Sequence, residues 1–294
     1  MIWADHPDPG RPLTADYAKD VLVTTDWLAE HLDDESVVVA EVDENPDLYE
    51  EGHIAGAVKL HWRDDLQDPV ERDLIDRERF ERLLGERGIV NESTVVLYGD
   101  RNNWFAAYAY WYLKIYGHED VRILDGGRQK WIDEGRELTT DVPARQRVDY
   151  RARERNETLR AYRDAVRENI GSPDKVLVDV RSPQEFSGEL VSPPGYEQEG
   201  AQRAGHIPSA QSVPWAQAVR DDGTFRPREE LAELYESKGV TPGKDVTAYC
   251  RIGERSAHTW FVLRELLGYE QVRNYDGSWT EWGNLVDVPI EKGS

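Results

Sequence analysis

The chain of 294 residues contains one cysteine, Cys250, and one methionine. A single cysteine excludes a disulfide within the chain. No apolar run reaches about 18 residues, so the sequence predicts no transmembrane helix. Residues 1–20 lack a basic stretch followed by an apolar one, and we expect a polar arm there rather than a signal peptide. Without a disulfide or an export pattern, the sequence indicates a cytoplasmic protein.

Basic residues are also scarce. Lys and Arg number 36 against 58 Asp and Glu, which gives a net charge of −22. Nucleic acids and anionic membranes bind clustered Lys and Arg, so we expect neither as a partner. The acidic surface by itself indicates solubility, or a salty or acid-tolerant habitat. Against that background, the stretch YCRIGERS (249–256) places two arginines beside the only thiol, as a local positive spot.

The sequence repeats itself along its length. The stretch VVLYGDRNNWFAAYAYWYLKIYGHEDVRILDGGRQKWIDEG matches VTAYCRIGERSAHTWFVLRELLGYEQVRNYDGSWTEWG, with Tyr98 against Tyr249 at an offset of 151 positions. Upstream, EGHIAGAVKLHW matches AGHIPSAQSVPW, with His53 against His206. Agreement at so many Gly and Trp positions indicates a tandem duplication. A catalytic histidine would have been lost from a degenerate copy, so we interpret both histidines as structural.

Each copy alternates short β-branched runs with helical patterns. Strands are expected over residues 36–42, 93–99, 175–180, 245–250 and 271–277, and helices over 76–88, 102–118, 228–239 and 255–268. This alternation predicts an α/β fold with two similar domains, each a mainly parallel sheet flanked by helices on both faces.

The domain boundaries follow from composition. We expect an N-terminal domain over residues 21–140, a polar linker over 141–157 and a C-terminal domain over 158–294. Residues 187–203 have no counterpart in the first copy and are rich in Gly, Pro and Gln. We therefore predict a surface loop there, a candidate border of a site.

Cys250 ends a predicted strand just before a predicted helix. In parallel sheets, ligands bind outside the carboxyl ends of the strands. Loop N–H groups, the helix N-terminus, Arg251 and Arg255 all favour an anion, so we expect a lowered pKa for the Cys250 thiol. The alternative is a small buried apolar residue at a strand end.

The first copy provides an internal comparison. It has Gly99 where the second has Cys250, and Asp43 where the second has Arg181. Loss of these groups with retention of the scaffold indicates one active and one degenerate copy.

The two halves, the DVRSPQEF and GHIP blocks and the Cys-Arg-x-Gly-x-Arg-Ser loop resemble the tandem-domain rhodaneses, from about Val21 to Ile290. That family comprises thiosulfate sulfurtransferases and their 3-mercaptopyruvate relatives. The resemblance implies two rhodanese-like domains, the first catalytically inactive and the second catalytic. It implies that Cys250 is the nucleophile, and that substrate is bound by Arg181, Arg251, Ile252, Gly253, Glu254 and Arg255.

Two loop positions bear on the donor. Arg251 lies where thiosulfate-using members have a basic residue, whereas mercaptopyruvate-preferring members tend to have small residues. Glu254 departs from the apolar residue of many members. A carboxylate beside a dianion costs electrostatic energy unless it turns away or pairs with Arg255.

The resemblance implies transfer of the sulfane sulfur of thiosulfate, a small anionic donor, to a thiol or cyanide acceptor. A Cys250 persulfide forms, sulfite is released, and no metal or organic cofactor is required. Two alternatives stay open: 3-mercaptopyruvate as donor, and a sulfur-carrier or regulatory module loaded by a protein donor.

A cysteine phosphatase or arsenate reductase is disfavoured by loop length. Those loops place five residues between Cys and Arg, whereas Cys250 and Arg255 enclose four. The sequence leaves open the physiological acceptor and the choice between monomer and homodimer.

Overall fold

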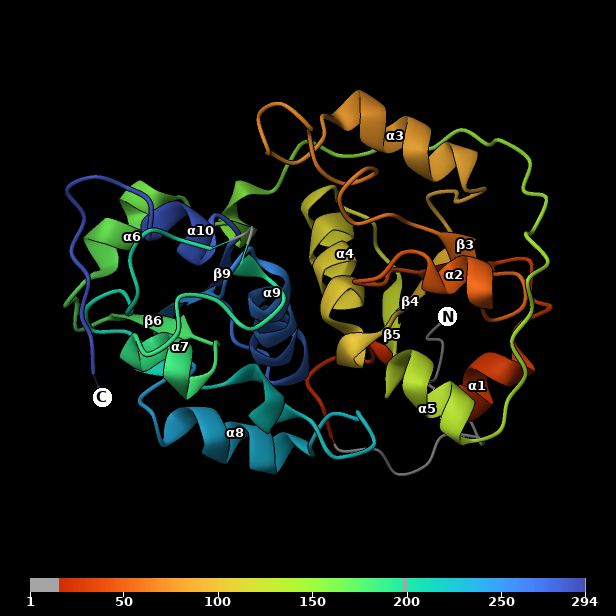
Figure 1. Ribbon diagram of the computed structural model, residues 1–294. Helices are drawn as coiled ribbons and strands as arrows, with labels where there is room; N and C mark the ends of the chain where they lie inside the picture. The colour runs from red at the N-terminus through yellow and green to blue at the C-terminus, as the bar shows by residue number, and fades with distance from the viewer. Residues whose placement is uncertain (1–15, 198–199, 294) are drawn as a thin grey trace, which may run out of the picture.

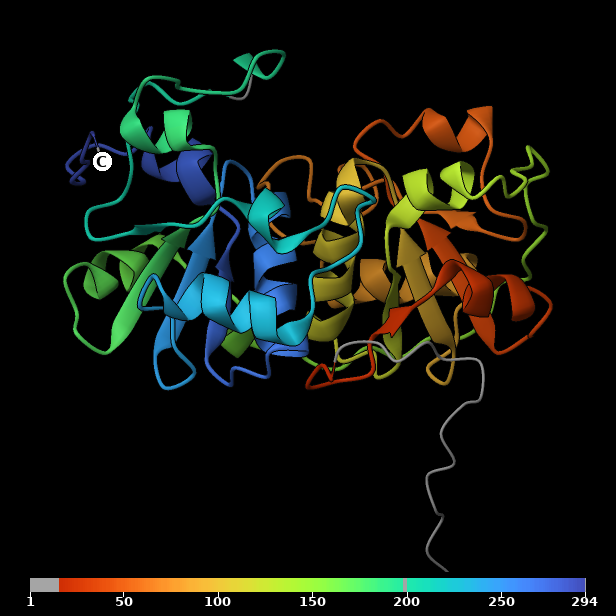
Figure 2. The same ribbon diagram turned by 90° about the horizontal axis from the view of Figure 1, so that it is seen from below.

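A computed structural model describes residues 16–197 and 200–293, in which two sheets lie side by side, each with its own helices (Figure 1, Figure 2). Of the polar arm expected over residues 1–20, residues 1–15 lie outside the described residues. Within the described ranges, no helix is long and apolar enough to cross a membrane.

The first sheet has five parallel strands in the order β1-β5-β4-β2-β3. They are β1 (Leu22–Val23), β2 (Val37–Glu41), β3 (Val58–Lys59), β4 (Thr94–Tyr98) and β5 (Val121–Leu124). The helices are α1 (Thr25–Glu30), α2 (Leu48–Glu51), α3 (Arg77–Glu86), α4 (Trp104–Ile115) and α5 (Gly127–Asp133). Apolar side chains of α3 and α4 pack on one face of the sheet, and those of α1 and α5 on the other.

The second sheet has four parallel strands in the order β7-β6-β8-β9. They are β6 (Lys175–Asp179), β7 (Gln211–Ser212), β8 (Asp245–Tyr249) and β9 (Val272–Tyr275). The helices are α6 (Arg163–Asn169), α7 (Pro183–Ser187), α8 (Arg228–Glu236), α9 (Glu254–Phe261) and α10 (Ser278–Trp282). Side chains of α8 and α9 pack on one face and those of α6 and α10 on the other, which confirms the predicted fold class.

The matching histidines of the two copies make equivalent contacts. His53 Nδ1 lies 2.8 Å from the Tyr49 carbonyl, and His206 Nδ1 lies 2.8 Å from the Phe186 carbonyl. Each imidazole stacks on the ring of that same partner, at 3.8 and 3.6 Å between centroids. These bonds agree with the interpretation of both histidines as structural.

The two domains meet through equivalent helices, α4 and α9, which lie side by side (Figure 1, Figure 2). The Tyr110 ring packs edge-on against Phe261, with 4.8 Å between centroids. Both helices begin at the carboxyl end of a central strand. The repeat-equivalent residues Trp104 and Arg255 therefore face each other across the interface, with the guanidinium carbon 5.8 Å from the indole centroid.

Residues 141–156, all of them described, form no helix or strand and run along the first domain. Val148 N–H donates to the Gly85 carbonyl at 3.0 Å, and Arg153 N–H donates to the Tyr116 carbonyl at 2.9 Å. The segment between the domains is thus bound to the first of them.

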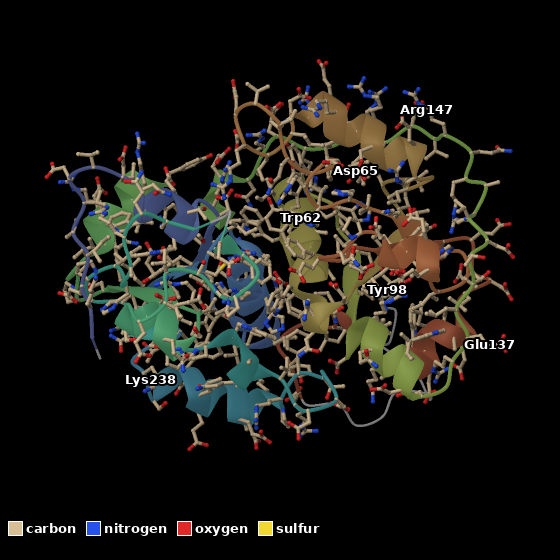
Figure 3. The ribbon with its side chains drawn as sticks, in the orientation of Figure 1. Trp62, Asp65, Tyr98, Glu137, Arg147 and Lys238 are labelled. Atoms are coloured by element: carbon tan, nitrogen blue, oxygen red, sulfur yellow. The ribbon has the colours of Figure 1, made fainter. Side chains whose placement is uncertain are left out.

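Charged side chains such as Arg147 and Lys238 lie at opposite outer edges of the molecule (Figure 3).

Candidate active site

Strand β8 delivers Cys250 to a tight loop that closes at Gly253, directly before α9. Gly253 has a φ of 105°, and a Cβ there would lie 2.8 Å from the Asp276 Cβ. Only glycine meets both demands. The loop is also fixed at its start, because Cys250 N–H donates to Ser278 Oγ at 3.0 Å.

The Cys250 sulfur is fully buried and lies among polar groups. Gly253 N–H donates to Sγ at 3.1 Å, and Ser256 Oγ lies 3.5 Å away. The thiol donates to Glu254 Oε2 at 3.3 Å. The sulfur thus has a backbone donor on one side and a carboxylate on the other.

Burial raises the pKa of the Cys250 thiol, and the Glu254 carboxylate raises it further. Arg255 and Ser256 lower the pKa by less. The expected lowering of this pKa is therefore wrong. The sequence shows two arginines beside the thiol, but it does not show that a carboxylate points at the sulfur.

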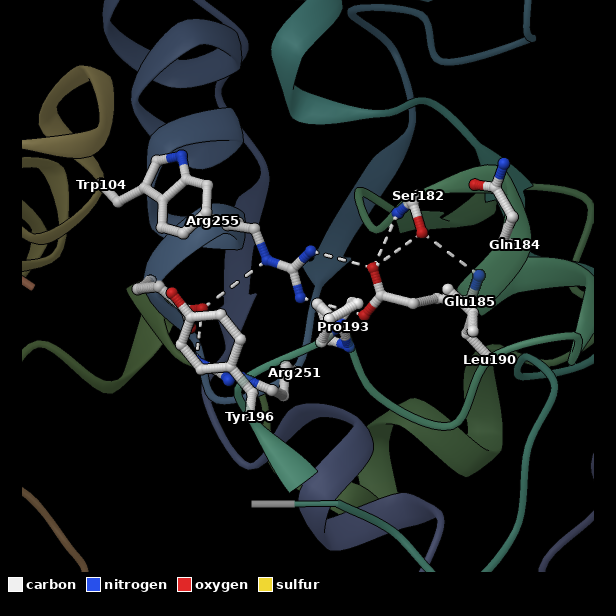
Figure 4. A pocket seen from close by; sticks show the side chains of 11 residues that line it. Trp104, Ser182, Gln184, Glu185, Leu190, Pro193, Tyr196, Arg251 and Arg255 are labelled. Atoms are coloured by element: carbon white, nitrogen blue, oxygen red, sulfur yellow. Dashed lines mark hydrogen bonds and ion pairs between the residues drawn. The ribbon is translucent and has the colours of Figure 1, made fainter. Parts of the chain in front are cut away.

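Arg255 is held by a residue from another helix. Its guanidinium donates to both oxygens of Glu185, at 3.0 and 3.2 Å (Figure 4). Glu185 in turn accepts the Ser182 N–H, and the Ser182 hydroxyl accepts the Glu185 N–H, in a capping box that begins α7. Burial raises the pKa of Glu185, but the charge and hydrogen bonds of Arg255 outweigh this and hold the pKa below its usual value.

Glu254 pairs with both loop arginines. Its Oε1 lies 3.5 Å from Arg251 Nη2 and 3.6 Å from Arg255 Nε. The Arg251 guanidinium also stacks on the Tyr196 ring, 4.0 Å from its centroid. Glu254 therefore pairs with Arg255, as anticipated, but it does not turn away from the sulfur.

A cavity of about 330 Å³ opens beside this loop (Figure 4). It is lined by Trp104, Ser182, Gln184, Glu185, Leu190, Pro193, Pro194, Tyr196, Arg251, Glu254 and Arg255. The lining combines charged side chains, the uncharged polar residues Ser182 and Gln184, and apolar or aromatic side chains. Trp104 belongs to the first domain, so the cavity lies where the domains meet.

We call residues 187–203 the strap, of which residues 198–199 lie outside the described residues. Its residues Leu190, Pro193, Pro194 and Tyr196 line the cavity, which confirms that the strap borders the site. The Tyr196 hydroxyl donates to Glu44 of the first domain. Glu44 also accepts from Arg101 Nε at 2.8 Å. The strap is thus anchored on the opposite domain.

The other residues that were predicted to bind substrate, Arg181, Ile252 and Gly253, do not line the cavity. Arg181 lies outside the cavity lining, because its guanidinium donates to Asp179 Oδ2 at 2.6 Å and to the Gly205 carbonyl at 2.7 Å. Ile252 packs into the core. Gly253 reaches the sulfur through its N–H.

Four lining residues outside the strap were missed by sequence reasoning: Trp104, Ser182, Gln184 and Glu185. Tyr196 lies within the segment expected to border the site but was not singled out. The spacing of Ser182 and Glu185 in SPQE is that of a capping box, which was a readable signal for that pair. No local pattern marks Trp104 or Tyr196.

Two segments of the chain, residues 24–134 and 163–285, match the Rhodanese-like domain. The chain belongs to the rhodanese family. As a rhodanese it is a sulfurtransferase by family, and its relatives are named either putative thiosulfate sulfurtransferase or sulfur carrier protein.

The sulfur carrier protein TtuD of Thermus thermophilus is 59% identical over 277 residues, which cover 93% of this chain and 97% of the relative. A protein of Haloferax volcanii named "Putative thiosulfate sulfurtransferase" is 53% identical over 287 residues, covering 95% and 99%. Among solved structures, the anaerobic ergothioneine biosynthesis enzyme from Chlorobium limicola is 28% identical with a TM-score of 0.80, covering 93% of this chain and 70% of that one. An EanB variant in a cysteine-persulfide form aligns with a TM-score of 0.81 at 28% identity, with the same coverage.

The first rhodanese-like domain has no room for a cysteine at the equivalent position. A Cβ on Gly99 would lie 2.1 Å from the Val42 carbonyl oxygen. The loop that follows has left-handed backbone at Arg101, Asn102 and Asn103, with φ of 48°, 54° and 65°. A loop from the second domain also closes on it, because a Cβ on Gly223 would lie 3.1 Å from Asn102 Oδ1.

Proposed function

We propose that Cys250 of this rhodanese accepts the sulfane sulfur of thiosulfate as a persulfide and passes it to a thiol or cyanide. The observation that supports this proposal best is the placement of the only thiol. It lies in the loop between β8 and α9, 3.1 Å from the Gly253 N–H, and its loop neighbours Arg251 and Arg255 line the cavity. Such donors and cations stabilise negative charge on sulfur.

The reaction has two half-reactions. The Cys250 thiol releases its proton to solvent, and the thiolate attacks the outer sulfur of thiosulfate. The S–S bond of thiosulfate breaks, and sulfite leaves with the electron pair. A thiolate or cyanide then attacks the outer sulfur of the persulfide, and Cys250 leaves as thiolate.

Within this proposal the domains have different tasks. The second domain carries the reacting sulfur and the arginines that attract the donor. The first is catalytically inactive, which is supported by the absence of space for a side chain at Gly99. It contributes Trp104 and Glu44, one lining the cavity and one holding the strap. We assign Arg181 a supporting role behind the loop, because Asp179 already binds it.

A second candidate function is that of a sulfur carrier loaded by another protein. It is supported by the relative of that name at 59% identity and by the full burial of Cys250. A carrier would accept sulfur at Cys250 but would turn over small donors poorly.

Mass spectrometry tests the proposal directly. Protein treated with thiosulfate and then desalted should gain the mass of one sulfur atom, on the tryptic peptide that contains Cys250. The Cys250→Ser variant should gain none and should lose thiosulfate:cyanide turnover. Turnover above a few per cent in that variant would contradict the assignment. Persulfide formation with very slow turnover of wild-type protein would favour the carrier.

A further inference from the structure

Glu254 is held in one place by three neighbours. The carboxylate accepts from the Cys250 thiol at 3.3 Å, and it lies 3.5 Å from Arg251 and 3.6 Å from Arg255. The side chain is 1% exposed, so water does not screen its charge. Any donor that brings a sulfur atom to Cys250 meets this charge.

The charges of the cavity lining cancel. Arg251 and Arg255 are balanced by Glu185 and Glu254. Arg255 is already bound to Glu185 through two hydrogen bonds, so its positive charge is largely neutralised.

The charged groups on the other elements around the loop are also paired. Asp276, beside Gly253, is bound by Arg160 through two contacts of 2.9 Å, and Arg181 is bound by Asp179 at 2.6 Å. Glu254 is hydrogen-bonded to the sulfur itself, and it offsets the attraction that the two loop arginines would otherwise exert on an anion.

We propose that Glu254 is a specificity-determining residue that lowers the affinity of the site for dianionic sulfur donors relative to monoanionic ones. The proposal rests on the sulfurtransferase function proposed above. A fixed unit charge acts twice as strongly on a dianion as on a monoanion at the same distance, because the Coulomb energy is proportional to the ligand charge. The apolar and aromatic lining residues, which include Trp104, Leu190 and Pro193, offer a dianion no charged contact in compensation.

Glu254 also affects the sulfur itself. It accepts the S–H hydrogen bond and thus stabilises the protonated thiol, which is not the reacting form. Its replacement by Gln should therefore act on both steps in the same direction, with stronger capture of a dianion and easier ionisation of Cys250. This sign separates a specificity role from a role as catalytic base, for which the replacement would slow persulfide formation.

The test measures binding without turnover. In a Cys250→Ser background, calorimetry should show that Glu254→Gln tightens thiosulfate binding on the order of tenfold and pyruvate binding about threefold. Glu254→Asp retains the charge and should bind thiosulfate nearly as the parent does. Glu189→Gln removes the same charge from an exposed position on the strap and should change neither affinity. Thermal unfolding checks that each variant is folded.

Several results would overturn the proposal. Thiosulfate binding that is unchanged or weaker in Glu254→Gln would do so, and equal tightening in Glu254→Asp would show that shape, not charge, is responsible. With Cys250 restored, the ratio of kcat/KM for thiosulfate to that for 3-mercaptopyruvate should rise about threefold in Glu254→Gln. An unchanged ratio, with kcat/KM lowered for both donors, would indicate a catalytic base instead. The ionised fraction of the Cys250 thiol affects both donors equally, so it cancels from this ratio. Tighter binding without any sulfur transfer would reject the proposed function and leave the inference about Glu254 intact.

Discussion

The contact between Tyr196 and Glu44 is the point at which the strap is tied to the first domain, and Tyr196→Phe removes only its hydrogen bond. The phenyl ring can still stack on Arg251. Cys250 is fully buried next to Arg251, which lines the cavity together with Tyr196, and we expect a reagent to reach the sulfur more readily when the strap moves. We therefore expect this substitution to raise the reactivity of Cys250.

The size of the effect follows from the partners. A hydrogen bond to a charged group contributes about 1.5–3 kcal/mol. Glu44 is 17% exposed and keeps its ion pair with Arg101, which reduces the loss to about 1–2 kcal/mol. Since each ~1.4 kcal/mol is a factor of ten, the open population should rise about 5- to 30-fold.

The assay is the rate of alkylation by iodoacetamide, followed by intact mass. The chain has one cysteine, so the signal belongs to Cys250 alone. Tyr162→Phe is a matched control, because the Tyr162 hydroxyl donates to Glu157 at 2.8 Å and its ring lies under Arg160 at 4.8 Å. The control variant should alkylate at the wild-type rate.

An unchanged alkylation rate in Tyr196→Phe would show that this bond does not limit access to the sulfur. An equal increase in Tyr162→Phe would show a general loss of stability instead. Either result refutes the idea that the first domain holds the strap closed.

Two further predictions concern stability. Gly99→Ala should lower the free energy of unfolding by about 2 kcal/mol or more, because its Cβ would lie 2.1 Å from the Val42 carbonyl, whereas Gly243→Ala, with open space around it, should have little effect in the same urea titration. Burial lowers the pKa of His258 from 6.5 to about 3. Below about pH 6.5 the imidazole is therefore protonated in the unfolded chain but stays neutral in the folded protein. Stability should therefore fall as the pH drops from about 6.5 toward 3, by about 1.4 kcal/mol per pH unit from this group. In His258→Phe, the free energy of unfolding should fall less between pH 7 and pH 5 than it does in the wild-type protein. An equal shift of the urea midpoint between these two pH values in both proteins would contradict the assignment.

The sequence was informative where structure follows from local pattern. The runs over residues 36–42 and 245–250 contain β2 and β8, because a strand covered on both faces is largely apolar. The helix expected over residues 255–268 is less regular than predicted. It is α9 to Phe261 and then a π-helical turn over Val262–Leu266, which the apolar spacing does not distinguish.

The candidate site was less predictable, because its residues come together from distant segments. Arg251 and Arg255 were recognised as charges near a thiol, but their partners Glu185 and Tyr196 lie more than fifty positions away in sequence. Arg181 shows the opposite case. It lies two residues after Asp179, and alternate residues of an extended segment share a face, so this pairing was readable from the spacing.

The facing pair of Trp104 and Arg255 has a consequence for the ancestry of the molecule. The two halves meet through the same helix, as subunits of an isologous dimer do. In such a dimer these positions would be one residue facing its own copy, either two arginines in mutual repulsion or two tryptophans without a charge. Fusion of the two copies into one chain breaks this constraint, because each copy can then change alone. The asymmetric pair of an indole and a guanidinium, 5.8 Å apart, is available to a fused chain and not to a symmetric pair of subunits.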